Sequence, residues 1–293
     1  GTDLATLQSK ALDAFGATHA IANCLWGGQV LHSEDMSAVV CRAVNDWIAE
    51  QWLAKEPRLR ASIVVPVQNT ELAVEEIERL AHDKRFVQVL LLVMGDMPLG
   101  KRHYWPIYAA AERHGLPIGI HAGSAYRHPV TPLGWPSYYT EDYAAQAAAF
   151  QQGLSSLICE GVFTKFPDLK IAYSEGQIGW IPYILERADT VWRENRAWGG
   201  VADKVLEPPS ELFKRHVYGC FFDDPHGVRC LEEVGVDNVT YETDYPHTDT
   251  TWPHTMEYVE KVMAGIPDEI VYKILRGNAL RMLSLNDDLK LVN

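Results

Sequence analysis

The sequence lacks any hydrophobic run long enough to cross a membrane. Its longest candidate, residues 86–94, is interrupted by Gln88, whereas a transmembrane helix needs about 20 consecutive apolar residues. Residues 1–4 contain neither the basic nor the apolar region of a signal peptide. We therefore expect a protein without a membrane partner.

Cysteines and basic residues are also few. The five cysteines are widely spaced and form no Cys-x-x-Cys pair, which disfavours a disulfide framework or a zinc cluster and indicates free thiols in the cytoplasm. Lys and Arg number 26 against 39 Asp and Glu, so the net charge is −13 at pH 7. Because nucleic-acid binding needs a basic surface, we expect no nucleic-acid partner.

Glycine-rich nucleotide motifs are absent as well. Neither Gly-x-Gly-x-x-Gly nor Gly-x-x-x-x-Gly-Lys-[Ser/Thr] occurs, which disfavours an open, doubly wound nucleotide-binding sheet. No linker rich in Ser, Gly or Pro divides the chain. We therefore predict one domain over residues 1–293.

The sequence does contain an alternation of short apolar runs with amphipathic stretches. Seven continuous runs are typical of strands that are buried on both faces of a parallel sheet: 17–24, 61–67, 86–93, 117–121, 169–174, 216–221 and 238–243. Helical stretches follow them at 37–53, 71–81, 104–114, 143–159, 178–192, 225–234 and 267–283. The alternation predicts an α/β fold of the (β/α)8 TIM-barrel type, one strand short of the eight that a closed barrel has.

Polar side chains stand at the ends of three of these runs. His121 ends the fourth run, Glu175 follows the fifth and Asp244 follows the seventh. The carboxyl ends of barrel strands converge on one mouth, where an imidazole and two carboxylates could bind a divalent metal or act as acid and base. Each also has a structural alternative: a loop histidine, a helix cap at Glu175 and an Asx-turn at Asp244.

Four segments resemble the amidohydrolase-2 family of the amidohydrolase superfamily, which includes aminocarboxymuconate-semialdehyde decarboxylase-like enzymes. They are LPIGIHAG (116–123), FPDLKIAYSE (166–175), ETDYPH (242–247) and NALRML (278–283). The resemblance implies a (β/α)8 barrel that holds a divalent metal, zinc or manganese. It implies hydrolysis or non-oxidative decarboxylation of a small carboxylated cyclic or unsaturated compound, and by analogy a homodimer.

The resemblance also implies roles for single residues. His121 and Asp244 correspond to metal ligands, and Asp244 would in addition take up or deliver a proton. Glu175 stands where the family has a histidine, and would serve as a second acid–base group or an added ligand. His247 would lie near the mouth, where it touches the substrate or orients Asp244; a histidine of a surface loop is the alternative.

The family's first strand carries a His-x-His pair, and this pair occurs nowhere in the sequence. We therefore expect that the first strand of the barrel is missing or is not included in this chain. A metal held by fewer protein ligands is bound weakly or not at all, because water replaces each lost ligand. We accordingly expect weak or absent metal binding if no such strand exists.

A long loop, 124–139, follows the fourth run. It contains Tyr126, Arg127 and Trp135, and aromatic rings beside an Arg suit an unsaturated carboxylate. We predict these three as substrate-binding residues of a lid. Because Tyr, Trp and Arg are also enriched at interfaces, a dimer contact is the alternative.

The leading interpretation is a metal-dependent hydrolase or non-oxidative decarboxylase of a small molecule. One alternative is a metal-free hydrolase, in which the carboxyl groups of Glu175 and Asp244 lie roughly 5–9 Å apart. Another is a catalytically impaired barrel that binds a ligand or a partner.

Overall fold

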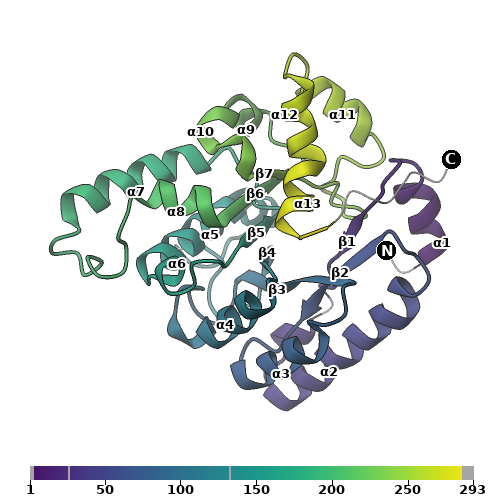
Figure 1. The fold of residues 1–293 in the computed structure, drawn as a ribbon, viewed down its shortest axis with the longest axis horizontal. Helices are drawn as coiled ribbons and strands as arrows, with labels where there is room; N and C mark the ends of the chain where they lie inside the picture. Colours follow the sequence, from purple (N-terminus) through teal and green to yellow (C-terminus); the bar gives the residue numbers. More distant parts are fainter. Residues whose placement is uncertain (1–2, 26, 132, 286–293) are drawn as a thin grey trace.

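Seven parallel strands form the centre of the molecule. The structure is a computed structural model and describes residues 3–25, 27–131 and 133–285. The strands lie in the order in which they occur in the chain (Figure 1). They are β1 (Ala20–Ala22), β2 (Leu59–Val64), β3 (Phe86–Met94), β4 (Ile118–Ser124), β5 (Ile171–Ser174), β6 (Val217–Phe221) and β7 (Val239–Tyr241).

The predicted α/β fold and its seven strands are confirmed. Each strand pairs in parallel with the next one along the chain, as in a (β/α) barrel. Within the described residues, no ladder joins β1 to β7, so the sheet curls into an incomplete barrel. Eight of the nine residues of β3 are buried, which explains why the strands are continuous hydrophobic runs.

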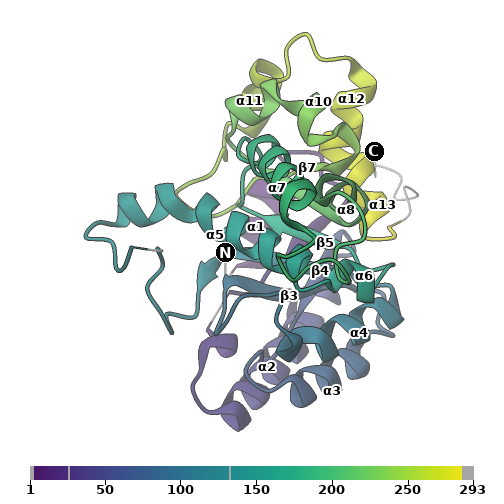
Figure 2. The ribbon, with the colours of Figure 1, turned by 90° about the vertical axis from the view of Figure 1, so that its left-hand side faces the viewer.

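Helices cover the outer face of the sheet (Figures 1 and 2). Those predicted from periodicity are α2 (Glu34–Ile48) with the π-helical turn η3 (Ala49–Leu53), α3 (Thr70–Leu80), α4 (Trp105–His114), α5 (Tyr139–Cys159), α7 (Ile181–Asn195), α9 (Pro225–Arg229) with α10 (Leu231–Val234), and α12 (Asp268–Tyr272) with η6 (Lys273–Gly277) and α13 (Asn278–Met282). Polar caps mark several starts: Ser33 accepts a hydrogen bond from the main chain of Met36, and Asn69 caps α3.

Shorter elements fill the connections. They are α1 (Leu4–Leu7), η1 (Gln8–Leu12), η2 (Gly28–Val30), η4 (Arg102–Tyr104), α6 (Val162–Lys165), α8 (Pro209–His216), η5 (Val236–Asn238) and α11 (Thr255–Val262). The sequence pattern does not predict α8 and α11, because each has eight residues. Two turns of helix contain too few apolar positions to establish a period.

The main hydrophobic core lies between the strands and the outer helices. Ile63, Val89 and Ile118 of the sheet belong to it, together with Phe150 of α5. A second buried cluster contains Ala172, Tyr218 and, at the end of α13, Met282. None of the helices in the described part of the chain has the length and hydropathy that a bilayer crossing requires. The packed strands hold their carboxyl ends in fixed relative positions.

Candidate active site

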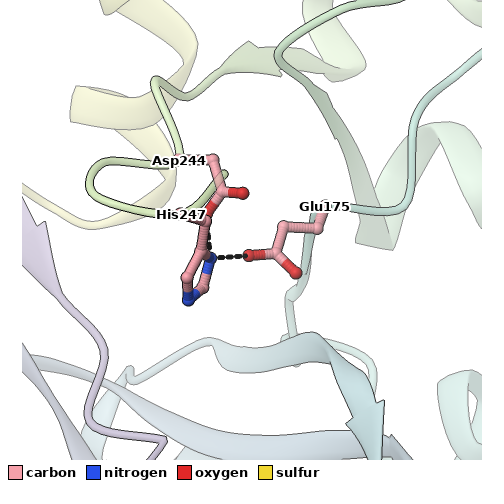
Figure 3. A group of neighbouring side chains, drawn as sticks. All are labelled: Glu175, Asp244 and His247. Carbon is pink, nitrogen blue, oxygen red and sulfur yellow. Dashed lines mark hydrogen bonds and ion pairs between the residues drawn. The ribbon is translucent and has the colours of Figure 1, made fainter. Parts of the chain in front are cut away.

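The carboxyl ends of β4, β5 and β7 bring four polar side chains together. His121 belongs to β4, Glu175 directly follows β5, and Asp244 and His247 lie in the turn after β7. Glu175, Asp244 and His247 each offer one atom that could bind a metal, and these three atoms lie within 4.8 Å of one another (Figure 3). Nε2 of His121 adjoins this group at 3.2 Å from Oε1 of Glu175.

The imidazole of His247 lies between the two carboxylates (Figure 3). Its Nδ1 atom is 2.8 Å from Oδ1 of Asp244 and 3.3 Å from Oε1 of Glu175. The side chains of Asp244 and Glu175 are only 7% and 9% exposed, whereas that of His247 is 46% exposed. His247 therefore connects a buried pair of carboxylates with solvent.

His121 is buried and has a defined orientation. Its Nδ1 atom lies 2.7 Å from the carbonyl oxygen of Ala122, and since a carbonyl only accepts hydrogen bonds, Nδ1 carries the proton. A neutral imidazole in this tautomer presents the Nε2 lone pair toward Glu175. Metal-ligating histidines are commonly held in this way by a hydrogen bond from their other nitrogen.

Three residues at the site have a left-handed main chain. The φ angles are +61° at Glu175, +56° at Gln177 and +56° at Asp244. Non-glycine residues rarely adopt this conformation, and where they do they tend to cluster at functional sites. The directions of the Glu175 and Asp244 side chains thus depend on left-handed turns of the main chain, which the surrounding structure must stabilise.

The four groups shift one another's pKa values. Burial would raise the pKa of Glu175, but the imidazoles of His121 and His247 lower it below its usual range. Burial and the neighbouring Glu175 raise the pKa of Asp244. The contact with Asp244, and then that with Glu175, raises the pKa of His247 to about 10. Burial opposes the charged form of His121, yet Glu175 raises its pKa.

This set of donor atoms fits a divalent ion. Oδ2 of Asp244 is buried and has no hydrogen-bond partner, and the buried Oε1 of Glu175 has only the two imidazoles beside it. Ligand atoms at right angles around an ion the size of manganese or zinc lie about 3 Å apart, close to the observed separations. Imidazole and carboxylate suit zinc and manganese. The proximity of the two carboxylates also disfavours a metal-free acid–base pair with roughly 5–9 Å between its members.

The predicted substrate-binding residues lie outside this group. Tyr126 and Trp135 are exposed, on the segment that projects from the body before α5 (Figure 2). The guanidinium of Arg127 donates from Nε to Asp96 at 2.8 Å and from Nη2 to the carbonyl oxygen of Val30 at 3.0 Å. Arg127 thus ties its loop to those after β1 and β3, and the substrate-binding role of the three residues stays a prediction.

Two residues near the site have no role in the sequence interpretation. Glu242 is partly buried, and its carboxylate accepts hydrogen bonds from the hydroxyl of Ser174 and the main-chain N–H of Glu175. Tyr143 of α5 lies against Tyr139, with ring centroids 4.8 Å apart and the ring planes tilted by 38°. Burial, chiefly, and more weakly the charges of the two site carboxylates, raise its pKa. The position of Glu242 at the end of the seventh run, two residues before Asp244, was the available signal for this residue. The stretch of α5 offered none for Tyr143.

A comparison with protein families supports the resemblance seen in the sequence. The family model named Amidohydrolase (Amidohydro_2) matches residues 1–285. The chain belongs to this amidohydrolase family. The family prediction is thereby confirmed over nearly the whole chain.

Similar amidohydrolases include decarboxylases of small aromatic carboxylates. A gamma-resorcylate decarboxylase from Polaromonas sp. is 28% identical over 262 residues, which cover 84% of this chain and 76% of that protein. The structure of 5-carboxyvanillate decarboxylase from Novosphingobium aromaticivorans, complexed with manganese and 4-hydroxy-3-methoxy-5-nitrobenzoic acid, has a TM-score of 0.78 at 21% identity and covers 97% and 81% of the two chains.

A second solved structure has the same fold. Dihydroxybenzoic acid decarboxylase from Polaromonas sp., with bound manganese and the inhibitor 2-nitroresorcinol, has a TM-score of 0.74 at 22% identity. The match covers 96% of this chain and 86% of that one. At this level of identity the two structures establish the shared barrel fold of the amidohydrolase.

Proposed function

We propose that this amidohydrolase is a divalent-metal-dependent, non-oxidative decarboxylase of a small aromatic carboxylate. The observation that carries the proposal is the pair of buried carboxylates, Glu175 and Asp244, which meet at Nδ1 of His247 while Oδ2 of Asp244 has no hydrogen-bond partner. Buried carboxylates are retained only where charge partners or a metal compensate them. The gamma-resorcylate decarboxylase at 28% identity suggests the reaction.

His121 through Nε2, Asp244 and Glu175 would hold the ion, which is zinc or manganese. When bound, it would polarise the substrate and stabilise the negative charge that develops as carbon dioxide leaves. His247 stands at the solvent side of this set.

Asp244 would deliver the proton that the reaction needs. The carbon–carbon bond to the carboxylate breaks, carbon dioxide leaves, and the electron pair stays on the ring carbon, which then takes the proton. His247, at 2.8 Å from Oδ1 of Asp244, would orient that carboxyl group and return a proton from solvent. Glu175, at 3.3 Å from Nδ1 of His247, would stabilise the charged form of that imidazole and serve as the second acid–base group or as an added ligand.

The remaining predictions belong to the same proposal. Residues 1–293 would form one domain, and the protein would act as a homodimer. Five free cysteines favour a reducing compartment, the cytoplasm. Tyr126, Arg127 and Trp135 would contribute to substrate binding through the loop before α5.

The decisive experiment measures carbon dioxide release. Protein loaded with manganese would be incubated with gamma-resorcylate and with 5-carboxyvanillate, and the metal content would be determined by elemental analysis. We expect decarboxylation that a chelator abolishes and manganese restores. Asp244→Asn should lower kcat by about 1,000-fold, while Glu257→Gln, which changes an exposed carboxylate, should leave kcat unchanged.

Other outcomes would favour the alternatives. A protein that binds manganese and hydrolyses esters or lactones of aromatic acids, without releasing carbon dioxide, would be a hydrolase. A protein that binds neither metal nor aromatic carboxylates would contradict the proposal and favour a barrel without catalytic activity.

A further inference from the structure

Glu242 is a partly buried residue whose carboxylate the proposed reaction does not use. It directly follows β7, and its Oε2 atom accepts a hydrogen bond of 2.6 Å from the hydroxyl of Ser174, the last residue of β5. Its Oε1 atom accepts a hydrogen bond from the main-chain N–H of Glu175. Both carboxylate oxygens of Glu242 thus accept hydrogen bonds from two consecutive residues at the end of β5.

The strand pairing explains why a side chain is needed there. The ladder between β5 and β6 ends at the pair Ala172 and Tyr218, whereas the ladder between β6 and β7 continues to Phe221 and Tyr241. The end of β5 therefore extends beyond its pairing with β6. The carboxylate of Glu242 spans from β7 to this end and supplies acceptors that the β6 main chain does not.

The residue that Glu242 holds is in a disfavoured conformation. Glu175 has a φ angle of +61°, which an L-residue keeps only where the surroundings determine it. In this conformation Oε1 of Glu175 lies 3.2 Å from Nε2 of His121 and 3.3 Å from Nδ1 of His247. Releasing the main-chain N–H of Glu175 would let the turn relax and would move the carboxylate away from both imidazoles.

We propose that Glu242 is a positioning residue, which holds the main chain of Glu175 in its left-handed turn and so places the Glu175 carboxylate between His121 and His247. The inference deepens the proposed function and rests on it to the extent that Glu175 serves in the reaction. What matters is the acceptor atom that Glu242 supplies to the N–H of Glu175.

Two substitutions of Glu242 distinguish the loss of its hydrogen-bond acceptors from the loss of its negative charge. Glu242→Leu keeps a similar volume and removes both acceptors. Glu242→Gln keeps one acceptor for the N–H of Glu175, because the hydroxyl of Ser174 can reverse and accept from the new amide. We expect the Leu variant to lower kcat by about 30-fold with KM changed by less than about 3-fold. The Gln variant should stay within about 5-fold of the wild type.

A double mutant tests whether Glu242 acts through Glu175. In a Glu175→Gln background, Glu242→Leu should lower kcat no further, because the group that it positions is already inactive. The matched control is Thr240→Val, two residues earlier on β7. It removes a buried hydrogen bond of 3.3 Å to the carbonyl oxygen of Gly219, and it should leave kcat within about 2-fold. If the Leu variant does not fold, Glu242→Asp, whose side chain is too short for both contacts, takes its place with the same expected effects.

Additive losses in the double mutant, or a Gln variant as slow as the Leu variant, would overturn the inference. Crystal structures of the wild type and the Leu variant provide a readout that needs no activity. We expect φ of Glu175 to leave the left-handed region in the variant, and an unchanged Glu175 would overturn the inference as well. A wild type without decarboxylase activity, but with this shift of Glu175 in the variant, would contradict the proposed function and leave the positioning role supported.

Discussion

His247 shows how one side chain depends on its immediate neighbours. In the sequence it fits either a surface loop or the mouth of the barrel, since it stands three residues after Asp244 in a turn with Pro246. In the structure its main-chain N–H donates to the carbonyl oxygen of Asp244 at 2.9 Å. This turn brings the imidazole of His247 next to the carboxylate of Asp244, where it could exchange a proton with that carboxylate.

Replacing His247 by Asn should lower kcat by about 100-fold, because Asn cannot exchange a proton with Asp244. The melting temperature should fall, because the variant loses the imidazole that pairs with both carboxylates, so kcat is compared at a temperature at which both proteins are folded. His254→Asn is the matched control: His254 lies in the same loop region and is exposed, so kcat should stay at the wild-type value. Equal kinetic effects of the two substitutions would show that His247 has no specific role.

Asn45 connects α2 with β2 and α3. The periodicity of the sequence predicts these elements one by one but not the contacts between them. It is fully buried on α2, and its Nδ2 atom donates to the carbonyl oxygen of Val64 in β2 at 2.9 Å and to Glu76 of α3 at 2.8 Å. Its Oδ1 atom accepts from the main-chain N–H of Val64 at 3.0 Å. One amide thereby fixes two helices and a strand, with every polar atom satisfied.

Asn45→Ala should lower the free energy of unfolding by about 3 kcal/mol, because the buried N–H and carbonyl of Val64 lose their hydrogen bonds to Asn45, and Glu76 keeps only those from Arg79. Urea denaturation of the two proteins measures this difference. Val39→Ala, on the exposed face of the same helix, should change the free energy by less than about 0.5 kcal/mol. Since Ala is a better helix former than either Asn or Val, a similar loss for both variants would contradict the role of the buried amide.

At the scale of the whole molecule, an ion pair and a hydrogen bond attach the N-terminal segment to the residues before β2. Glu56, before β2, is buried and accepts hydrogen bonds from Nε of Arg58 at 2.9 Å and from Nε2 of Gln8 in η1 at 3.0 Å. Arg58 also pairs with Asp13 at 2.8 Å. The hydrogen bonds from Arg58 lower the pKa of Glu56 to about 2, although burial opposes the charged form.

Because folding lowers this pKa from its usual value of 4.5, the group stabilises the folded state above about pH 4.5 and loses that contribution as pH falls toward 2. Glu56→Gln should cost roughly 2–3 kcal/mol at pH 6. The difference between wild type and variant should shrink as the pH is lowered to about 2.5. Urea titrations across this range measure it. An exposed control, Glu50→Gln, should show no such convergence, and a difference independent of pH would contradict this role for Glu56.

The barrel, and the meeting of His121, Glu175 and Asp244 at its mouth, could be predicted from the sequence, whereas His247 stayed open between the mouth and a surface loop. Parallel strands buried on both faces must be continuous apolar runs, and their ends must meet at one edge. The contacts of His247, the hydrogen bonds of Glu242 to the end of β5 and the attachment of Arg127 to neighbouring loops became evident only from the three-dimensional packing. These contacts join residues far apart in the chain, or depend on the path of a turn, and no local period in the sequence encodes them.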